Sequence, residues 1–118
     1  MNNNTVIAQL DDLQISARLA KVCTTHSYDL HFWEKDTDFP ANLNKSVLIL
    51  QLNGLNEDDL SRISSMKENR ELTIIGFSEN MDKNIVNYFK KWGFHMVIRR
   101  KDLLNNIVSL LENIFNGS

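Results

Sequence analysis

The sequence is poor in the residues that build the commonest small-protein sites. It has one cysteine, one proline and four scattered glycines among 118 residues. Because Cys23 is alone, it excludes an internal disulfide and a cysteine-based metal site, and we expect a reducing compartment, the cytoplasm. The glycines form no phosphate-binding loop, and no Gly-x-Ser-x-Gly nucleophile motif occurs. These absences count against the usual nucleotide-binding and hydrolase sites.

Charge of one sign and long apolar runs are also scarce. The formal net charge is −2 and the isoelectric point about 5.9, so no basic field points to nucleic acid. No stretch approaches the roughly 20 apolar residues of a membrane helix. The first residues lack the basic and apolar regions of a signal peptide. We therefore expect neither nucleic acid nor a membrane as a partner of this domain.

The sequence does contain a regular alternation of apolar and amphipathic segments. Hydrophobic residues make up 42% and charged residues 24%, as in an ordinary globular protein, so we expect one domain over residues 1–118 with its core within about 5–115. Runs of consecutive apolar residues are typical of strands covered on both faces. Five such strands are predicted, at Thr5–Leu10, Tyr28–Trp33, Val47–Leu52, Leu72–Phe77 and Phe94–Ile98.

The segments between these strands carry helix signals. One helical face is predicted by the spacing of Ile15, Leu19, Val22 and Cys23. Asn56 and Asp59 resemble a capping box, and Asp82 can cap a helix that stops at Gly93. Asp102 can cap the last helix, whose inner face we assign to Leu104, Ile107, Val108, Leu111 and Phe115. Residues 34–46 predict only a short helix of one or two turns, or a loop.

A strand–helix unit repeated five times predicts a particular architecture. Right-handed crossovers place helices on both faces of a parallel sheet. The expected fold is a flavodoxin-like (βα)5 three-layer α/β/α sandwich with strand order 2-1-3-4-5. Ligands of such folds bind at the carboxyl ends of the strands. The residues predicted there are Asp11, Asp12, Gln51, Asn53, Ser78 and Arg100.

These strand ends resemble the receiver domain of two-component response regulators over about residues 5–115. In that family an acidic pair follows the first strand, and QLDDL supplies Asp11 and Asp12. The phosphate-accepting aspartate ends the third strand, where this chain has Gln51. A serine or threonine ends the fourth strand, as Ser78 does. A lysine ends the fifth strand, where VIRRKDL gives Arg100.

This chain departs from the family pattern at the residues that would carry out its chemistry. The resemblance implies an aspartate nucleophile, with Mg²⁺ held by carboxylates to neutralise the phosphoryl oxygens. Gln51 has no carboxylate and cannot form an acyl phosphate, and Arg100 is a larger, planar cation than lysine. Val97 stands at the aromatic switch position. We predict a degenerate, or pseudo-receiver, domain that is not an enzyme and has no cofactor, with Mg²⁺ only a weak alternative at Asp11 and Asp12.

Several residues keep a plain structural alternative. Asp11 and Asp12 are compatible with helix capping, a retained metal pocket, or a salt bridge to Arg100. Ser78 is also typical of a helix cap or turn. Three functions remain open: a phosphorylation-independent interaction module in signal transduction, a receiver phosphorylated on Asp11 or Asp12, and a flavodoxin-like domain that binds a small ligand.

A partner surface is predicted in the last two units. Aromatic and arginine side chains are enriched in interface hot spots. The alternative is that the wide apolar stripe of the last helix only buries more core. The resemblance implies that a protein partner or a second copy docks on the family's fourth helix, fifth strand and fifth helix. Its candidate residues here are Tyr88, Trp92, Arg99, Lys101, Leu103, Leu110 and Ile114.

Overall fold

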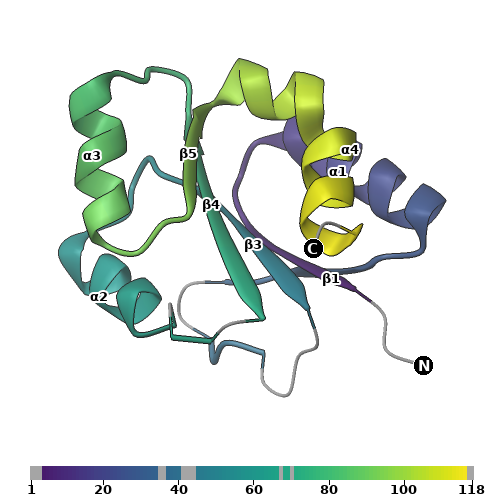
Figure 1. Ribbon diagram of the computed structural model, residues 1–118, viewed down its shortest axis with the longest axis horizontal. Coiled ribbons are helices and arrows are strands. Elements are labelled where there is room, and N and C mark those ends of the chain that lie inside the picture. Colours follow the sequence, from purple (N-terminus) through teal and green to yellow (C-terminus); the bar gives the residue numbers. More distant parts are fainter. Residues whose placement is uncertain (1–3, 35–36, 41–44, 67, 70, 117–118) are drawn as a thin grey trace.

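The computed structural model describes all residues except 1–3, 35–36, 41–44, 67, 70 and 117–118 (Figure 1). Strands and helices alternate along most of the chain, as the apolar pattern predicts. In chain order the elements are β1 (Thr5–Gln9), α1 (Leu13–His26), β2 (Asp29–Phe32), β3 (Ser46–Gln51), α2 (Glu57–Met66), β4 (Leu72–Ser78), α3 (Lys83–Lys91), β5 (Met96–Arg99) and α4 (Arg100–Asn116).

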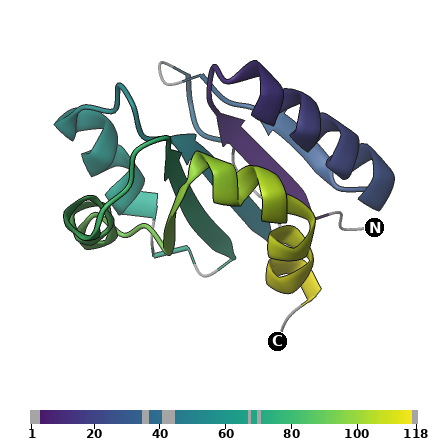
Figure 2. The ribbon, with the colours of Figure 1, turned by 90° about the horizontal axis from the view of Figure 1, so that it is seen from above.

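The five strands form one parallel sheet in the order β2-β1-β3-β4-β5. Helices α1 and α4 cover one face of this sheet, and α2 and α3 cover the other (Figures 1 and 2). The expected three-layer flavodoxin-like architecture and strand order are therefore confirmed. Within the described residues, no helix is long and apolar enough to cross a lipid bilayer.

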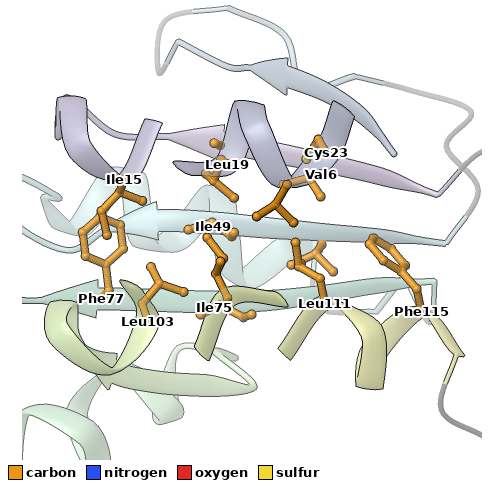
Figure 3. Close-up of a cluster of buried hydrophobic side chains, with 14 residues drawn as sticks. Val6, Ile15, Leu19, Cys23, Ile49, Ile75, Phe77, Leu103, Leu111 and Phe115 are labelled. Atoms are coloured by element: carbon orange, nitrogen blue, oxygen red, sulfur yellow. The ribbon is translucent and has the colours of Figure 1, made fainter. Parts of the chain in front are cut away.

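Two apolar clusters hold the layers together, one on each face of the sheet. Figure 3 shows Ile15 and Leu19 of α1 and Leu103 of α4 directed toward Ile49 and Ile75 of the strands. Cys23 lies in this cluster, where burial raises the pKa of its thiol to about 11 and leaves it unreactive. The buried residues of the second cluster are Ile7, Trp33, Leu48, Leu50, Leu52, Leu60, Ile63, Leu72, Ile74, Phe94 and Val97.

Three of the four helices begin at a residue for which the sequence allowed a cap, and the first of these is Asp12 before α1. Asn56 and Asp59 form the reciprocal capping box, with N···O distances of 3.0 and 2.9 Å. Asp82 accepts a hydrogen bond from Ile85 N at 2.9 Å and caps α3. The prediction for Asp102 is wrong, because α4 already begins at Arg100. Asp102 lies inside the first turn and pairs with Arg99 at 3.3 Å instead.

The segment after β2 departs from the repeat. Its described residues, 34, 37–40 and 45, contain no helix, and residues 35–36 and 41–44 lie outside the description, so the described chain has four helices rather than five. Trp33 covers the sheet at this place. Its indole N–H donates a hydrogen bond to Thr37 O at 3.1 Å, and its ring packs edge-on against Phe39. The Arg62 guanidinium lies over the same ring, 5.5 Å from its centre.

Candidate pocket at the strand ends

The carboxyl ends of parallel strands meet at one edge, and five of the six predicted residues meet there. Asp12, Gln51, Asn53, Ser78 and Arg100 line a shallow depression of about 140 Å³, together with Phe77 and Glu79. Asp11 lines a neighbouring depression of about 440 Å³ instead, which Gln51 and Asn53 also line. The sixth residue therefore shares an edge with the others but not their pocket.

Arg100 dominates the pocket, because its guanidinium joins the starts of two helices. Its Nε lies 2.5 Å from Asp12 Oδ2, and its Nη2 lies 3.2 Å from Asp12 Oδ1. The same Nη2 donates to Gln14 Oε1 at 2.7 Å. Asp12 is also the N-cap of α1 and accepts from Ile15 N at 3.1 Å. Two of the three interpretations of Asp12, the helix cap and the salt bridge, are therefore realised by one carboxylate.

The pairing keeps both groups charged. The hydrogen bond from Arg100 lowers the pKa of Asp12 below its ordinary value of 3.8, against burial, and the Ile15 N–H adds to the lowering. The hydrogen bond to Asp12 raises the pKa of Arg100 above its already high ordinary value. The two side chains are only 23% and 15% exposed, so they form a partly buried ion pair at any physiological pH.

The remaining polar groups of the pocket bond to each other. Gln51 Oε1 accepts from the main-chain N–H of Asp11 at 3.0 Å, which ties the end of β3 to the loop after β1. Ser78 Oγ donates to Asn53 Oδ1 at 3.1 Å across the ends of β4 and β3. Sequence reasoning missed Gln14 and Glu79. Gln14 lies in the first turn of α1, two residues after Asp12. This closeness in sequence to a predicted pocket residue could have identified it.

These partners do not fit Mg²⁺. The ion requires oxygen ligands in near-octahedral geometry, usually including one or two carboxylates. Both oxygens of Asp12 bind Arg100, whose positive charge also repels a metal ion. Gln51 offers only a neutral oxygen that already accepts a hydrogen bond. Within the described part of the chain, no group of three or more His, Cys, Asp or Glu side chains could hold a metal ion.

Val97 is a buried core residue rather than a surface reporter. It lies in the cluster with Leu52 and Phe94 and is 6% exposed. A branched aliphatic side chain in that position has no ring to swing between a buried and an exposed state. A change in the pocket therefore has no rotating aromatic group at this position through which to reach the surface of α3, β5 and α4.

The residues predicted for a partner surface are exposed or partly exposed, with one exception. Tyr88 is 46% exposed, Arg99 and Lys101 are exposed, and Trp92, Leu110 and Ile114 are partly exposed. The assignment of Leu103 to this surface is wrong, because only 1% of it is exposed. Since α4 begins at Arg100, its innermost stripe is Leu103, Ile107, Leu111 and Phe115, and two residues assigned to the inner face, Leu104 and Val108, flank it.

Comparison with solved structures shows what the architecture is similar to. A response regulator protein from Burkholderia multivorans matches with a TM-score of 0.77 and 13% identity, over 98% of this chain and 96% of that one. The chain has the receiver fold. Response regulator RPA3017, in red light signalling of R. palustris, has a TM-score of 0.68 and 18% identity over 98% and 96% of the two chains.

A further similar structure is that of a receiver domain solved as a dimer. The beryllofluoride-activated receiver domain dimer of NtrC4 has a TM-score of 0.60 and 17% identity, over 93% of this chain and 98% of that one. No protein-family model matches the sequence, and no curated protein matches it significantly. Within the receiver fold, Gln51 ends β3, Ser78 ends β4 and Arg100 directly follows β5.

Proposed function

We propose that this domain acts in signal transduction as a pseudo-receiver, which binds a protein partner without accepting a phosphoryl group. The side chains present in the pocket are the observation that supports this proposal most directly. The position of the acceptor carboxylate holds an amide, and the Asp12 carboxylate beside it is neutralised by Arg100. A receiver pocket needs a nucleophilic carboxylate and a divalent cation. At those positions this chain has an amide in place of the nucleophile and an arginine paired with the remaining carboxylate.

The proposed partner surface is the face formed by α3, β5 and α4, where a protein partner or a second copy docks. Tyr88 and Trp92 provide aromatic contact area, Arg99 and Lys101 provide positive charge, and Leu110 and Ile114 provide partly exposed apolar area. Aromatic and arginine side chains are the residue types that most often dominate binding energy. The absence of a switch ring at Val97 favours a surface that is constant rather than gated.

Incubation with a small phosphodonor, acetyl phosphate or phosphoramidate, and Mg²⁺ tests this proposal by intact-protein mass. The wild-type chain is expected to gain no phosphoryl group. The matched variant Gln51→Asp/Arg100→Lys, which restores the acceptor and the smaller cation, is expected to gain one. Labelling of the wild type at Asp11 or Asp12 would instead establish the alternative of a receiver with a displaced acceptor.

A second candidate is a small-ligand-binding domain, favoured by the depression of about 440 Å³ between the ends of β1 and β3. This is the point where the strand order reverses, the usual ligand position in such folds. Leu10, Trp33 and Leu55 supply its apolar lining and Asp11 and Glu34 its charge. Native mass spectrometry of the freshly purified protein checks it, and a mass above that of the bare chain would favour it.

A further inference from the structure

The outer side of β2 carries main-chain groups that the sheet does not use. β2 ends the strand order, and its only hydrogen-bonded neighbour within the described residues is β1. Asp29 N donates to Asn4 O and Trp33 N donates to Ala8 O, both at 2.9 Å. Since the bonds of a parallel ladder repeat at every second residue, the N–H and C=O groups of Leu30 and Phe32 point away from β1.

Within the described part of the chain, this edge lacks the usual protection against pairing. Natural edge strands commonly carry lysine or proline, or are covered by another segment. Residues 29–33 read DLHFW and contain neither lysine nor proline. Phe32 is 55% exposed, although it lies on the same face of the sheet as Val6 and Ala8 of the core. The opposite edge strand, β5, ends in an exposed arginine instead.

A second apolar residue extends this patch. Leu13 begins α1, the helix that packs on β2, and is 83% exposed, the highest value among the large apolar residues that the structure describes. Leu13 follows the carboxyl end of β1, and Phe32 stands at the carboxyl end of β2, which is the same edge of the parallel sheet. Both exposed apolar side chains therefore lie at the carboxyl ends of the two strands farthest from β5.

We propose that this surface, β2 with Leu13, is a homodimerisation edge on which a second copy of the chain pairs antiparallel, β2 to β2. A strand that pairs with its own copy about a two-fold axis closes the assembly and leaves no further edge there. The outward main-chain N–H and C=O groups of Leu30 form hydrogen bonds with those of Phe32 of the partner subunit. By symmetry, Phe32 pairs in the same way with Leu30 of the partner subunit. Apolar side chains then lie opposite each other on the α1 face, the arrangement that stabilises antiparallel pairs.

The charges permit this register. With Leu30 opposite the partner's Phe32, Asp29 lies opposite the partner's Trp33, so the carboxylates do not meet. His31 lies opposite the partner's His31 on the other face of the sheet, as a pair without main-chain hydrogen bonds. Such pairs have Cα atoms about 4.5 Å apart. The α3, β5 and α4 face stays free at the far edge of both subunits, so this inference is independent of the proposed function.

Sedimentation velocity from low micromolar to millimolar concentration tests the dimer. The wild type is expected to form a weak, reversible dimer, since a four-residue strand gives a small interface. Phe32→Lys places two charges in the seam and is expected to raise the dimer dissociation constant about tenfold or more. Ser61→Lys, at an exposed position on α2 outside both proposed surfaces, is the matched control and is expected to change nothing.

Disulfide trapping tests the register. In a Cys23→Ala background, His31→Cys is expected to cross-link across the two-fold axis, because a disulfide spans Cα atoms about 4.4–6.8 Å apart. Asp29→Cys is expected not to cross-link. Amide exchange of Leu30 and Phe32 should slow as concentration rises. A monomer at every concentration overturns the proposal, as does a dimer that Phe32→Lys leaves intact and Tyr88→Lys dissociates.

Discussion

At the scale of single residues, the ion pair between Arg100 and Asp12 determines what the pocket can do. The guanidinium occupies both oxygens of the carboxylate and leaves Asp11 as the one predicted acidic group without that neutralisation. Arginine suits this role because its planar fork binds a carboxylate at two points, which the ammonium of lysine cannot do. In this pocket the guanidinium of Arg100 balances the carboxylate charge, a role that a metal ion has in receivers.

This ion pair predicts a pH dependence of stability. Because the folded-state pKa of Asp12 is lowered, its contribution is present above the ordinary value of 3.8 and is lost as the pH falls through the lower folded-state pKa. Asp12→Asn should be less stable than the wild type at pH 7, and the two should converge in acid. Urea unfolding midpoints between pH 7 and pH 3 measure this, and a constant difference across that range would contradict it.

A second residue-scale prediction concerns Gly76, which is buried in β4. A Cβ atom there would lie 2.6 Å from Leu52 Cδ2 and 2.8 Å from the Phe94 ring. Gly76→Ala should therefore destabilise the fold by about 1–3 kcal/mol through overpacking. Combined with Leu52→Ala, which removes the nearest clashing atom, the two losses should be less than additive. Chemical denaturation measures both, and an unchanged midpoint for Gly76→Ala would contradict the packing described here.

How much of the site the sequence predicts depends on the kind of residue. The strand ends follow from the apolar runs, so Gln51, Ser78 and Arg100 could be placed at one edge. The choice among three roles for Asp12 could not be made, because it depends on where one long side chain extends in space. Gln14 was missed for the same reason, since its contact with Arg100 joins two distant segments.

At the scale of elements, the helices differ in how much apolar surface they bury against the sheet. α4 buries Leu103, Ile107, Leu111 and Phe115, whereas α3 has no buried residue and packs through partly exposed side chains such as Val86 and Phe89. Local opening is easiest where few apolar contacts are broken. The amides of α3 should therefore exchange about tenfold faster than those of α4, or more. Hydrogen exchange by NMR measures this, and equal protection would contradict it.

The end of α1 gives another prediction. Ser27 closes the helix in the left-handed region, with φ 59° and ψ 36°, which costs free energy for any residue with a Cβ atom. Ser27→Gly should stabilise the protein by about 0.5–1 kcal/mol. Ala20→Gly, inside the same helix, is the control and should destabilise it by about 1 kcal/mol. Thermal melts compare them, and a destabilised Ser27→Gly would contradict the role of that backbone.

Element boundaries were the least predictable level. Asp102 has the right residue type for a cap, but the chain turns directly from β5 into α4, so the helix starts at Arg100, three residues earlier than a cap at Asp102 implies. That shift also moves Leu103 from the predicted surface into the core. The strands were predicted more closely, because consecutive apolar residues mark a doubly covered strand whatever its neighbours do.

At the scale of the whole molecule, topology and pocket chemistry point in different directions. The strand order and both helical layers are those of the receiver fold, which the alternating pattern could predict. The chemistry depends on a few side chains at one edge, and there an amide and an ion pair stand where receivers use carboxylates and a metal. We therefore propose that this pocket binds neither Mg²⁺ nor a phosphoryl group.

The most direct test is an amide NMR titration of the free domain with millimolar Mg²⁺ and then with beryllofluoride, beside the Gln51→Asp/Arg100→Lys variant as a positive control. We predict that the amide resonances of Asp11, Asp12, Gln51 and Ser78 stay in place in the wild type and shift in the variant. Saturable shifts in the wild type that spread to Val97 and α4 would contradict it, because the pocket would then bind an ion and report it.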